Sequence, residues 1–586
     1  MTLFWVIIYL GIIAFLGYLG YKKTSGASDY LVAGRQIHPY IMALSYGATF
    51  ISTSAIVGFG GAAAVFGMGM LWLTVLNIFV GIFIAFVFFG KRTRTMGFHL
   101  DAHTFPEFLG KRYQSPFIQK FAGIVIFLFM PLYAGVVLMG AAAFIEQQLS
   151  ISYTTALLFF TLIVALYVIM GGLKGVMYTD AFQGTIMFIG MAILIVYTYH
   201  ILGGVIDAHQ ALTDMPVPPP LAAKGHNGWT SMPTFNSSYW WVMVTTLVMG
   251  VGIGVLAQPQ LVVRFMTVKS NRELNRAILV GGIFILMMTG VAFTTGALSN
   301  VFFSKNINNI SFSESTGMLM EIVPGVTVTE ENIDKFKVKY KGIAPGDKID
   351  TEKEEVQKAG KKGTIAIKAV GGNVENIIPQ YIKQAMPHWF SILFMLTLLA
   401  AAMSTLSSQF HAMGTAIGRD VYEQTVKNVT RSNEWSVYIS KIGIAFTIII
   451  SALLAYILPK FFGDAGIAII ARGTAIFFGL CAGSFLPAYM GALYFKAITR
   501  SAAITGMLGG FIVSALWITF IHDKEAKALG ICNALFGKPY LFDNTLAVVD
   551  PMLIALPISI ALTIIVSLFT KKFDETHVSM CFKDIA

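Results

Sequence analysis

One short stretch of the chain, residues 400–411, gathers hydroxyl side chains at helical spacing. If this stretch is a helix, intervals of three and four residues place its polar side chains on one face. The residues on that face are Ser404, Ser407, Ser408 and His411, and Thr405 borders it. Hydroxyls without a carboxylate suit a hard monovalent cation that accepts neutral oxygen ligands. Hydrogen bonding between helices is the alternative interpretation.

Two further apolar stretches, residues 45–61 and 250–260, are interrupted by glycines, hydroxyls and a proline. Inside a membrane span such interruptions mark either close helix packing or a broken helix that lines a cavity, because free backbone groups need partners in lipid. We expect broken helices, since the two stretches share this pattern. The residues at the breaks that are candidates for substrate binding are Ser52, Thr53, Ala55, Gln258 and Gln260.

Few ionisable residues fall within the apolar stretches, and such residues are candidates for function by default. Asp180 opens one stretch, where it could also complement a helix dipole. Arg472 lies inside another, and its planar fork could bind a substrate carboxylate or pair with Asp464, about two helical turns away. His200 and His411 are more typical of packing residues than of ligands.

The composition identifies the class of protein. Hydrophobic residues make up 56% of the 586 residues and charged residues only 12%, whereas soluble domains carry about 25% charged residues. The chain is therefore expected to be a polytopic membrane protein. The net charge of +11 does not indicate nucleic-acid binding, because the basic residues lie between apolar segments, as in cytoplasmic loops. The three cysteines are too far apart for a disulfide framework or a zinc site.

About thirteen apolar segments are long enough to span a bilayer. They cover residues 3–21, 41–66, 72–90, 122–144, 154–171, 181–202, 239–263, 278–303, 389–418, 436–458, 465–494, 502–521 and 551–569. The first has Lys22 and Lys23 after it rather than before it, so it is expected to be a retained helix. Basic residues concentrate in alternate connections, Arg264 among them, which predicts an N-terminus outside and a C-terminus in the cytoplasm.

The two interrupted stretches lie five helices apart. Because five is odd, two consecutive five-helix units must have opposite orientations, as in transporters with inverted repeats. The expected units are an extra helix and loop (1–40), a first repeat (41–202), an extracellular loop (203–238), a second repeat (239–495), and two further helices with a tail (496–586). The second repeat contains a charged extracellular insert, residues 304–386, with expected short strands at 336–340 and 364–367.

Three motifs together resemble one family. Gly171-Gly172-x3-Val176-x2-Thr179-Asp180-x2-Gln183 is similar to the signature of the sodium/solute symporter family, which includes sodium-coupled sugar, proline, sialic acid and pantothenate carriers. Residues 30–35 and 402–407 resemble two other conserved segments of that family. The resemblance covers about residues 29–500. It implies a LeuT-type core of five plus five inverted helices, alternating access, and sodium as the coupling ion.

The resemblance also implies sites for sodium. The family's principal sodium site takes backbone carbonyls and two hydroxyls at positions that match Ala48, Ile51, Ala401, Ser404 and Thr405. Some members hold a second sodium at positions that match Asp180, Ser404, Ser407 and Ser408. Sodium is the only ion or cofactor that the resemblance implies.

The substrate is less well defined. Sugar carriers of the family have a glutamine where this chain has Ala55, and proline carriers have an aspartate where it has Phe50. Arg472 in an otherwise neutral cavity favours a small carboxylate or an amino acid.

Other classes of function remain open at this stage. A membrane enzyme would need clustered acids, histidines or cysteines, and the predicted spans contain no such cluster. A channel would show continuous flux instead of saturable exchange. A proton-coupled carrier of the same fold, with Asp180 or His411 as the titrating group, is the main alternative. We expect the protein to be a monomer in the plasma membrane, surrounded by lipid and without a nucleic-acid partner.

Overall fold

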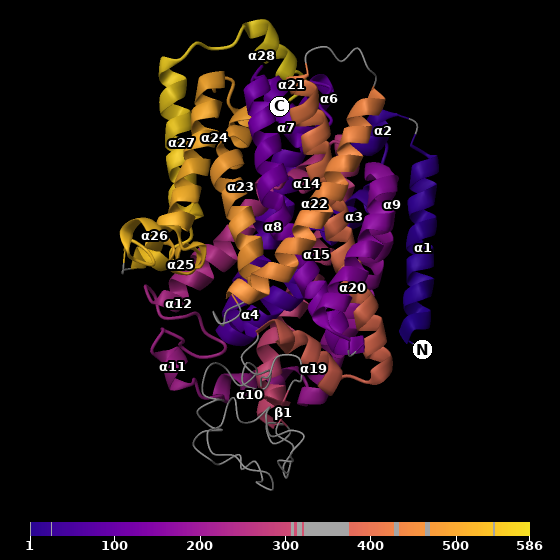
Figure 1. Ribbon diagram of the computed structural model, residues 1–586, viewed down its shortest axis with the longest axis vertical. Helices are drawn as coiled ribbons and strands as arrows, with labels where there is room; N and C mark the ends of the chain where they lie inside the picture. The colour runs from indigo at the N-terminus through magenta and orange to yellow at the C-terminus, as the bar shows by residue number, and fades with distance from the viewer. Residues whose placement is uncertain are drawn as a thin grey trace.

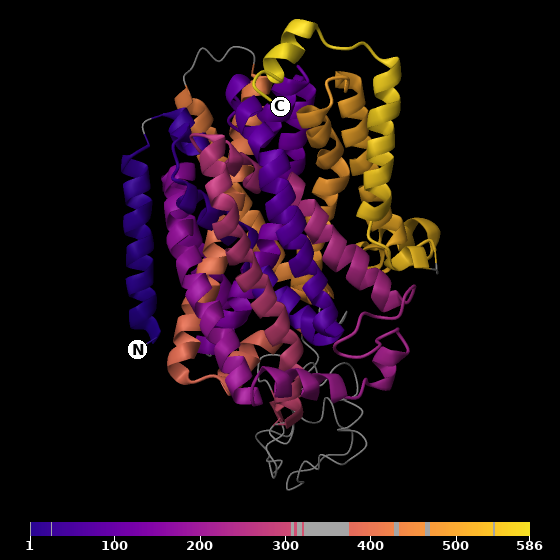
Figure 2. The same cartoon turned by 180° about the vertical axis from the view of Figure 1, so that it is seen from behind.

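The computed structural model describes the chain except for residues 1, 25, 150, 306–309, 313–318, 322–373, 427–432, 463–468, 543–544 and 586. The chain forms an upright bundle of helices that run mostly along its long axis (Figures 1 and 2). Within the described residues, eleven helical segments are long and apolar enough to cross a membrane. The expected all-α polytopic fold is therefore confirmed.

The long helices of the bundle are α1 (Thr2–Lys22), α8 (Pro116–Leu149), α9 (Tyr153–Leu202), α15 (Asn271–Lys305), α20 (His388–Thr415), α22 (Asn433–Phe462), α23 (Ile469–Tyr494), α24 (Arg500–Leu516) and α27 (Met552–Phe569). Shorter α-helices are α2 (Ala27–Val32), α3 (Pro39–Phe50), α4 (Phe59–Phe66), α5 (Leu71–Ile78), α6 (Lys91–His99), α7 (Phe105–Arg112), α10 (Val205–Asp214), α11 (Pro219–Ala222), α12 (Ser238–Trp241), α13 (Val251–Gly254), α14 (Pro259–Phe265), α19 (Ile377–Ala385), α21 (Glu423–Thr425), α25 (Asp523–Leu529), α26 (Ile531–Phe536) and α28 (Glu575–Cys581). Turns of 3₁₀- or π-helix are η1 (Ala33–Arg35), η2 (Ser54–Gly58), η3 (Gly67–Met70), η4 (Phe79–Gly90), η5 (Val242–Gly250), η6 (Val255–Ala257), η7 (Val374–Asn376), η8 (Ala416–Tyr422), η10 (Trp517–Ile521) and η11 (Thr545–Val548).

Two of the expected spans, 154–171 and 181–202, both lie in α9. The helix is interrupted only at Gly172, which has φ +56°. A Cβ at this position would lie 2.8 Å from a ring carbon of Tyr30, so both the backbone conformation and the close contact require glycine. This break explains why the sequence pattern reads as two segments. The count of thirteen spans and the five-plus-five repeat stay predictions.

Both expected helix breaks are present in the structure. α3 ends at Phe50, and Ile51 is extended before η2 begins at Ser54. In the second stretch η6 ends at Ala257, Gln258 is extended, and Pro259 starts α14. Proline favours the first position of a helix because its missing N–H is not needed there. Ile37, before α3, pairs with Val268, after α14, so the two broken segments meet at one end of the bundle.

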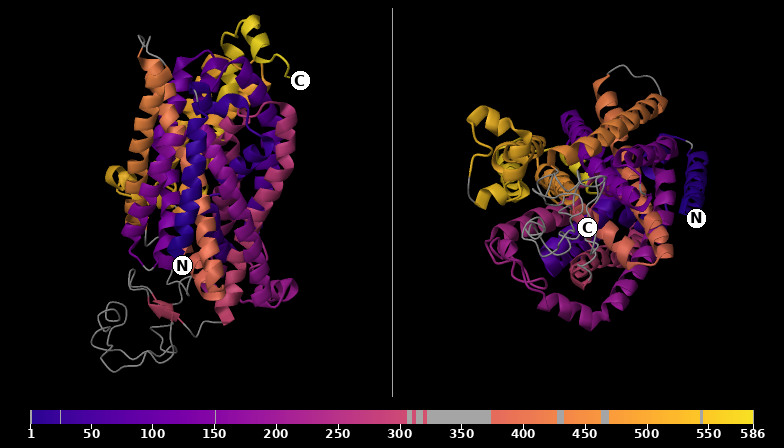
Figure 3. Two further views of the ribbon diagram at one scale, coloured as in Figure 1. Left: turned by 90° about the vertical axis from the view of Figure 1, so that its right-hand side faces the viewer. Right: turned by 60° about the horizontal axis from the view of Figure 1, so that its bottom comes forward.

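The two chain ends lie at opposite ends of the bundle. The N-terminus lies toward the end that carries α10, α19 and β1, and the C-terminus lies near α6, α7 and α28 (Figure 1). The left view of Figure 3 shows the same separation from the side. Opposite ends are what an odd number of crossings requires.

The insert contributes one short antiparallel pair, β1 (Ile310–Phe312) with β2 (Leu319–Glu321), in which Phe312 faces Leu319. The strands expected at 336–340 and 364–367 lie outside the described residues. The centre of the bundle is α20, which packs against α9, α8, α22 and α3. From Phe394 to Phe410 nearly every residue of α20 is buried, so its hydroxyls face protein and not lipid.

Candidate functional site

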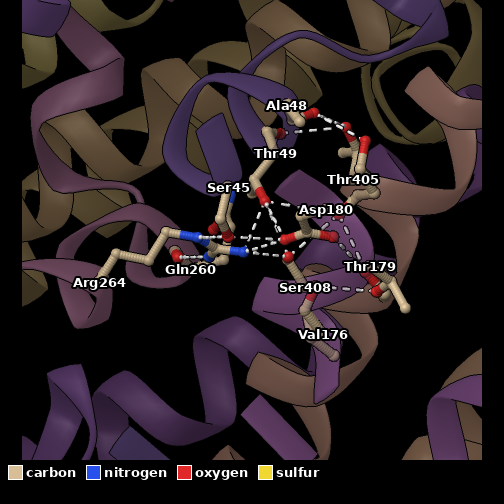
Figure 4. Close-up of polar contacts among 12 residues, drawn as sticks. Ser45, Ala48, Thr49, Val176, Thr179, Asp180, Gln260, Arg264, Thr405 and Ser408 are labelled. Atoms are coloured by element: carbon tan, nitrogen blue, oxygen red, sulfur yellow. Dashed lines mark hydrogen bonds and ion pairs between the residues drawn. The ribbon is translucent and has the colours of Figure 1, made fainter. Parts of the chain in front are cut away.

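The break after α3 brings backbone carbonyls to the hydroxyl stripe of α20. The Ser404 hydroxyl donates to the carbonyl oxygen of Ala48 at 2.9 Å, and the Thr405 hydroxyl donates to that of Thr49 at 3.0 Å. The Ser404 Oγ also lies 3.3 Å from the carbonyl oxygen of Ala401. We name the oxygens of Ala48, Ala401, Ser404 and Thr405 the carbonyl–hydroxyl cage; Figure 4 shows its Ala48 and Thr405 edge.

The cage contains four of the five residues expected at the principal sodium site. All four are fully buried. The fifth, Ile51, is the extended residue that ends α3, and its N–H still donates to the Gly47 carbonyl at 2.9 Å. The structure adds the carbonyl of Thr49, which faces Thr405 and was not predicted. Neutral oxygens in a buried site are the ligands that a hard monovalent cation needs.

A carboxylate lies directly beside the cage. Asp180, from the second half of α9, accepts hydrogen bonds from Ser45 at 2.8 Å and Thr49 at 3.3 Å. On its other oxygen it accepts from Ser407 at 3.3 Å. Ser408 joins this group through Thr49, with 2.9 Å between the two hydroxyl oxygens. Ser407 and Ser408 also donate to the Ser404 carbonyl, each at 3.0 Å, so the four residues expected around a second sodium lie together. Figure 4 shows Asp180 and Ser408.

The cation in this group is Arg264. Its Nη2 lies 2.8 Å from Asp180 Oδ2, and both side chains are completely buried. The same guanidinium donates to Thr49 at 2.6 Å and to Ser45 at 3.0 Å, and it also contacts Ser408 and the Gln260 carbonyl. The pair thus connects α14 with α9, α3 and α20 (Figure 4).

The expectation that Arg264 lies in a cytoplasmic loop is wrong, because Arg264 is buried in α14. The apolar stretch 239–263 ends one residue earlier, so Arg264 looks like a flanking charge. The break at Gln258 starts a new helix, α14, and Arg264 lies on the side of that helix that faces Asp180. One signal could have identified it: a buried carboxylate at position 180 requires a cation nearby.

A small pocket lies next to this ion pair, between it and the start of α7. Its lining includes Leu31, His103, Gln260, Arg264, Ser408 and His411. His411 is held by a contact of 3.0 Å between Nε2 and the Tyr30 carbonyl. The pocket therefore borders the guanidinium side of the pair.

The candidate substrate residues at the breaks are buried and mostly bonded to neighbours. Thr53 donates to the Val137 carbonyl at 2.8 Å, and Ser52 accepts from the Ser54 N–H at 3.1 Å. Gln260 donates to the Gln258 side chain at 3.3 Å. Ala55 is partly buried against the core. These residues line the two breaks, as expected, and their part in binding a substrate stays a prediction.

Arg472 has a partner that the sequence analysis did not identify. It forms an ion pair with Glu525 of α25, and His522 contacts the same carboxylate. Burial raises the pKa of Glu525, but the charges of Arg472 and His522 outweigh this effect and hold that pKa well below its usual range. Asp464, the partner considered from sequence, lies outside the described residues. The guanidinium is therefore engaged at the α25 end of the molecule.

A third ionic cluster lies at the opposite end, around α7. The Glu107 carboxylate is 2.9 Å from Lys111 Nζ and 3.1 Å from Arg419. Burial raises the pKa of Glu107, but its hydrogen bond with His103 and the charges of Arg419 and Lys111 bring that pKa below the usual range. This cluster fastens α7 to η8, the turn that follows α20.

Comparison with known proteins yields one family. The chain matches the sodium:solute symporter family over residues 30–319 and 355–510. It is 26% identical to sodium/proline symporter 2 of Staphylococcus saprophyticus, over 97% of this chain and 93% of that one. It is also 26% identical to a sodium/proline symporter of Staphylococcus aureus, over 99% and 95%.

Among solved structures, a substrate-bound, outward-open sodium-coupled sialic acid symporter has the same fold, with a TM-score of 0.68 at 17% identity. That match covers 97% of this chain and 98% of the other.

Proposed function

Because this chain belongs to the sodium:solute symporter family, we propose that it imports a small organic solute together with sodium by alternating access. The observation that supports this function best is the carbonyl–hydroxyl cage, in which the Ser404 hydroxyl and the Ala48 carbonyl, 2.9 Å apart, come from two different helices. A sodium ion bound there would hold α20 against the broken end of α3.

The Ser404 hydroxyl can change from donor to ligand and still keep one hydrogen bond within its own helix. Ser404 Oγ lies 2.9 Å from the Ala48 carbonyl and 2.8 Å from the Ala400 carbonyl of its own helix. When sodium binds, the Ser404 hydroxyl can direct its proton to the Ala400 carbonyl, and the Ser404 lone pairs and the Ala48 carbonyl then face the ion. Serine and threonine in helices commonly donate to the residue four positions earlier. The site can therefore fill and empty at low cost.

One sodium ion per cycle would supply enough energy for concentrative uptake. A tenfold sodium gradient is worth about 1.4 kcal/mol, and a membrane potential of about 100 mV adds about 2.3 kcal/mol. The sum of about 3.7 kcal/mol corresponds to about 500-fold accumulation of the solute.

For the solute we propose a small amino acid or another small carboxylate. The two bacterial relatives that match nearly the whole chain are named for proline. Phe50, which stacks on Phe478 with ring centroids 6.5 Å apart, stands where the resemblance has aspartate in proline carriers. We therefore place proline in a panel of candidates rather than alone. The Arg472–Glu525 pair removes the original reason for favouring a carboxylate, so the preference now depends on the relatives.

We place the chain in the plasma membrane, with its N-terminus outside and its C-terminus in the cytoplasm. The distribution of basic residues between the expected connections supports this orientation. The opposite positions of the two chain ends agree with it.

The test removes one oxygen from the cage. Thr405→Ala should raise the sodium concentration needed for half-maximal thermal stabilisation of the purified protein about tenfold or more, which is about 1.4 kcal/mol. Thr405→Ser keeps the oxygen and should stay close to wild type. Thr397→Ala is a matched control, because Thr397 is buried in the same helix but donates to the Leu393 carbonyl at 3.1 Å.

The same variants are then compared in reconstituted vesicles to which a panel of radiolabelled amino acids that includes proline is added outside. Sodium-dependent uptake that Thr405→Ala weakens would support the proposal. Uptake that follows an imposed proton gradient and ignores sodium would contradict it and would favour the proton-coupled alternative.

A further inference from the structure

Asp180 lies in a second oxygen cage next to the first one. Three helices contribute to it: α9 through Asp180, α3 through Ser45 and Thr49, and α20 through Ser407 and Ser408. Each of these side chains is at most 2% exposed. A buried carboxylate surrounded by hydroxyl oxygens attracts a cation strongly, because its charge has no water to solvate it.

That cage already contains a cation. Arg264 Nη2 lies 2.8 Å from Asp180 Oδ2 and 2.6 Å from Thr49 Oγ1, and it also contacts Ser408 Oγ. These three oxygens surround one nitrogen as ligands surround an ion (Figure 4). A guanidinium keeps its proton in proteins, so this positive charge is permanent.

We propose that Arg264 is a built-in cation that fills the Asp180 cage, so that this carrier binds one sodium ion and not two. The inference rests on the proposed function for its sodium ion in the carbonyl–hydroxyl cage. A sodium ion at Asp180 would lie within a few ångströms of the guanidinium, where burial strengthens the repulsion between like charges. The residues that a second sodium would use are present, but the Arg264 guanidinium already contacts their oxygens.

A tethered cation differs from a free ion in what can move it. Arg264 belongs to α14, which begins directly after the helix break at Gln258. Its charge can leave Asp180 only if α14 moves or the side chain swings toward the pocket that it lines. The cation in the Asp180 cage is therefore released by movement of the second broken segment and is not exchanged directly with sodium from solution.

The experiment counts sodium ions with radioactive sodium alone, because this needs no knowledge of the solute. Equilibrium binding to the purified full chain in detergent should give one sodium per wild-type protein, lost in Thr405→Ala at the same sodium concentration. Arg264→Gln removes the built-in cation and should bind two. Arg264→Lys keeps a positive charge and should bind one, and so should the double variant Arg264→Gln with Asp180→Asn, which has no free carboxylate.

A matched control breaks a different buried pair. Arg472→Gln removes an arginine whose partner, Glu525, lies outside the hydroxyl cages, and its sodium count should stay at one. This variant separates the effect of an open cage from the general effect of losing an arginine.

Two results would overturn the inference. One is a wild-type protein that binds two sodium ions, a measurement that needs no variant and stays decisive if Arg264→Gln fails to fold. The other is an Arg264→Gln protein that binds one ion, still lost on adding Thr405→Ala. Failure of the proposed function has a different signature: the wild type would bind no sodium, or its binding would be indifferent to Thr405→Ala.

Discussion

Two buried arginine–carboxylate pairs in this protein differ in what surrounds them. Arg264 and Asp180 are both 0% exposed, and the groups around them are neutral hydroxyls from α3 and α20. Arg472 and Glu525 are 9% and 10% exposed, and a third ionisable residue, His522, contacts the same carboxylate. We call them the inner pair and the outer pair.

The difference indicates two roles. The inner pair joins both broken segments to α9 and α20, so helix movements that open the site must change it. The outer pair joins α23 to the short helix α25, beside α26 in Figure 1, and so fastens a connection between spans. We therefore expect the inner pair to respond to sodium and the outer pair to contribute only stability.

Arg264→Gln should have the largest effect. In sodium-free choline buffer it leaves a buried carboxylate without its cation, which costs about 3–5 kcal/mol of unfolding free energy. Sodium should restore part of this loss, by about 2.7 kcal/mol at about 100 times its dissociation constant. Denaturant titrations in detergent, with and without sodium, measure both quantities. Arg276→Gln, at an exposed position on α15, should stay within about 0.5 kcal/mol of wild type.

Glu525→Gln should have the next largest effect. It leaves Arg472 largely buried without its charged partner, and we expect a loss of about 2–3 kcal/mol because slight exposure lets water replace part of the contact. Sodium should not restore it. Glu423→Gln is the matched control, since Glu423 pairs with Arg419 at a side-chain exposure of 22%, and it should cost under about 1 kcal/mol. Rescue of Glu525→Gln by sodium would remove the distinction between the two pairs.

Acid should weaken the outer pair. Because the pKa of Glu525 is lower in the folded protein than in the unfolded chain, the stability it contributes is present above about pH 4.3, the usual pKa of glutamate. It is lost as the pH falls below that value. The wild type should lose about 1–2 kcal/mol more than Glu525→Gln between about pH 6 and pH 3. Glu107, whose pKa is also lowered, should add a loss of the same sign that Glu107→Gln removes. Equal slopes for wild type and variants would contradict this assignment.

Arg472→Lys should have the smallest effect. Lysine keeps the charge but not the planar fork, so we expect a change of under about 1 kcal/mol and an unchanged sodium affinity. If Arg472 bound the solute carboxylate instead, this variant would weaken solute uptake markedly while its stability stayed normal. Comparing uptake with unfolding free energy for the same variant separates the two roles.

Much of this architecture could be predicted from the sequence. Hydroxyls at helical spacing in residues 404–408 indicated a polar face inside a span, and the structure turns Ser404 and Thr405 toward the carbonyls of Ala48 and Thr49. Glycines and the proline located both helix breaks. These features depend on neighbours in sequence, where periodicity and proline chemistry apply directly.

The charge partners could not be predicted in this way. Arg264 lies 84 residues from Asp180, and Arg472 lies 53 residues from Glu525. Apolar length placed Arg264 outside the membrane and Arg472 inside it, so Arg264 was not expected as the partner of Asp180. The partner of each arginine depends on where a short helix lies, α14 for Arg264 and α25 for Arg472, and that position depends on tertiary packing.

Thr49 belongs to both cages at once. Its carbonyl oxygen accepts a hydrogen bond from the Thr405 hydroxyl at 3.0 Å, and its hydroxyl oxygen accepts one from the Arg264 guanidinium at 2.6 Å. Because one residue contacts both cages, the two sites are thermodynamically linked. If sodium in the carbonyl–hydroxyl cage fixes Thr49, it changes the free energy of the Arg264–Asp180 pair. The pair must then change the free energy of sodium binding by the same amount. Reciprocity of this kind would let the state of a helix break be measured as a change in ion affinity.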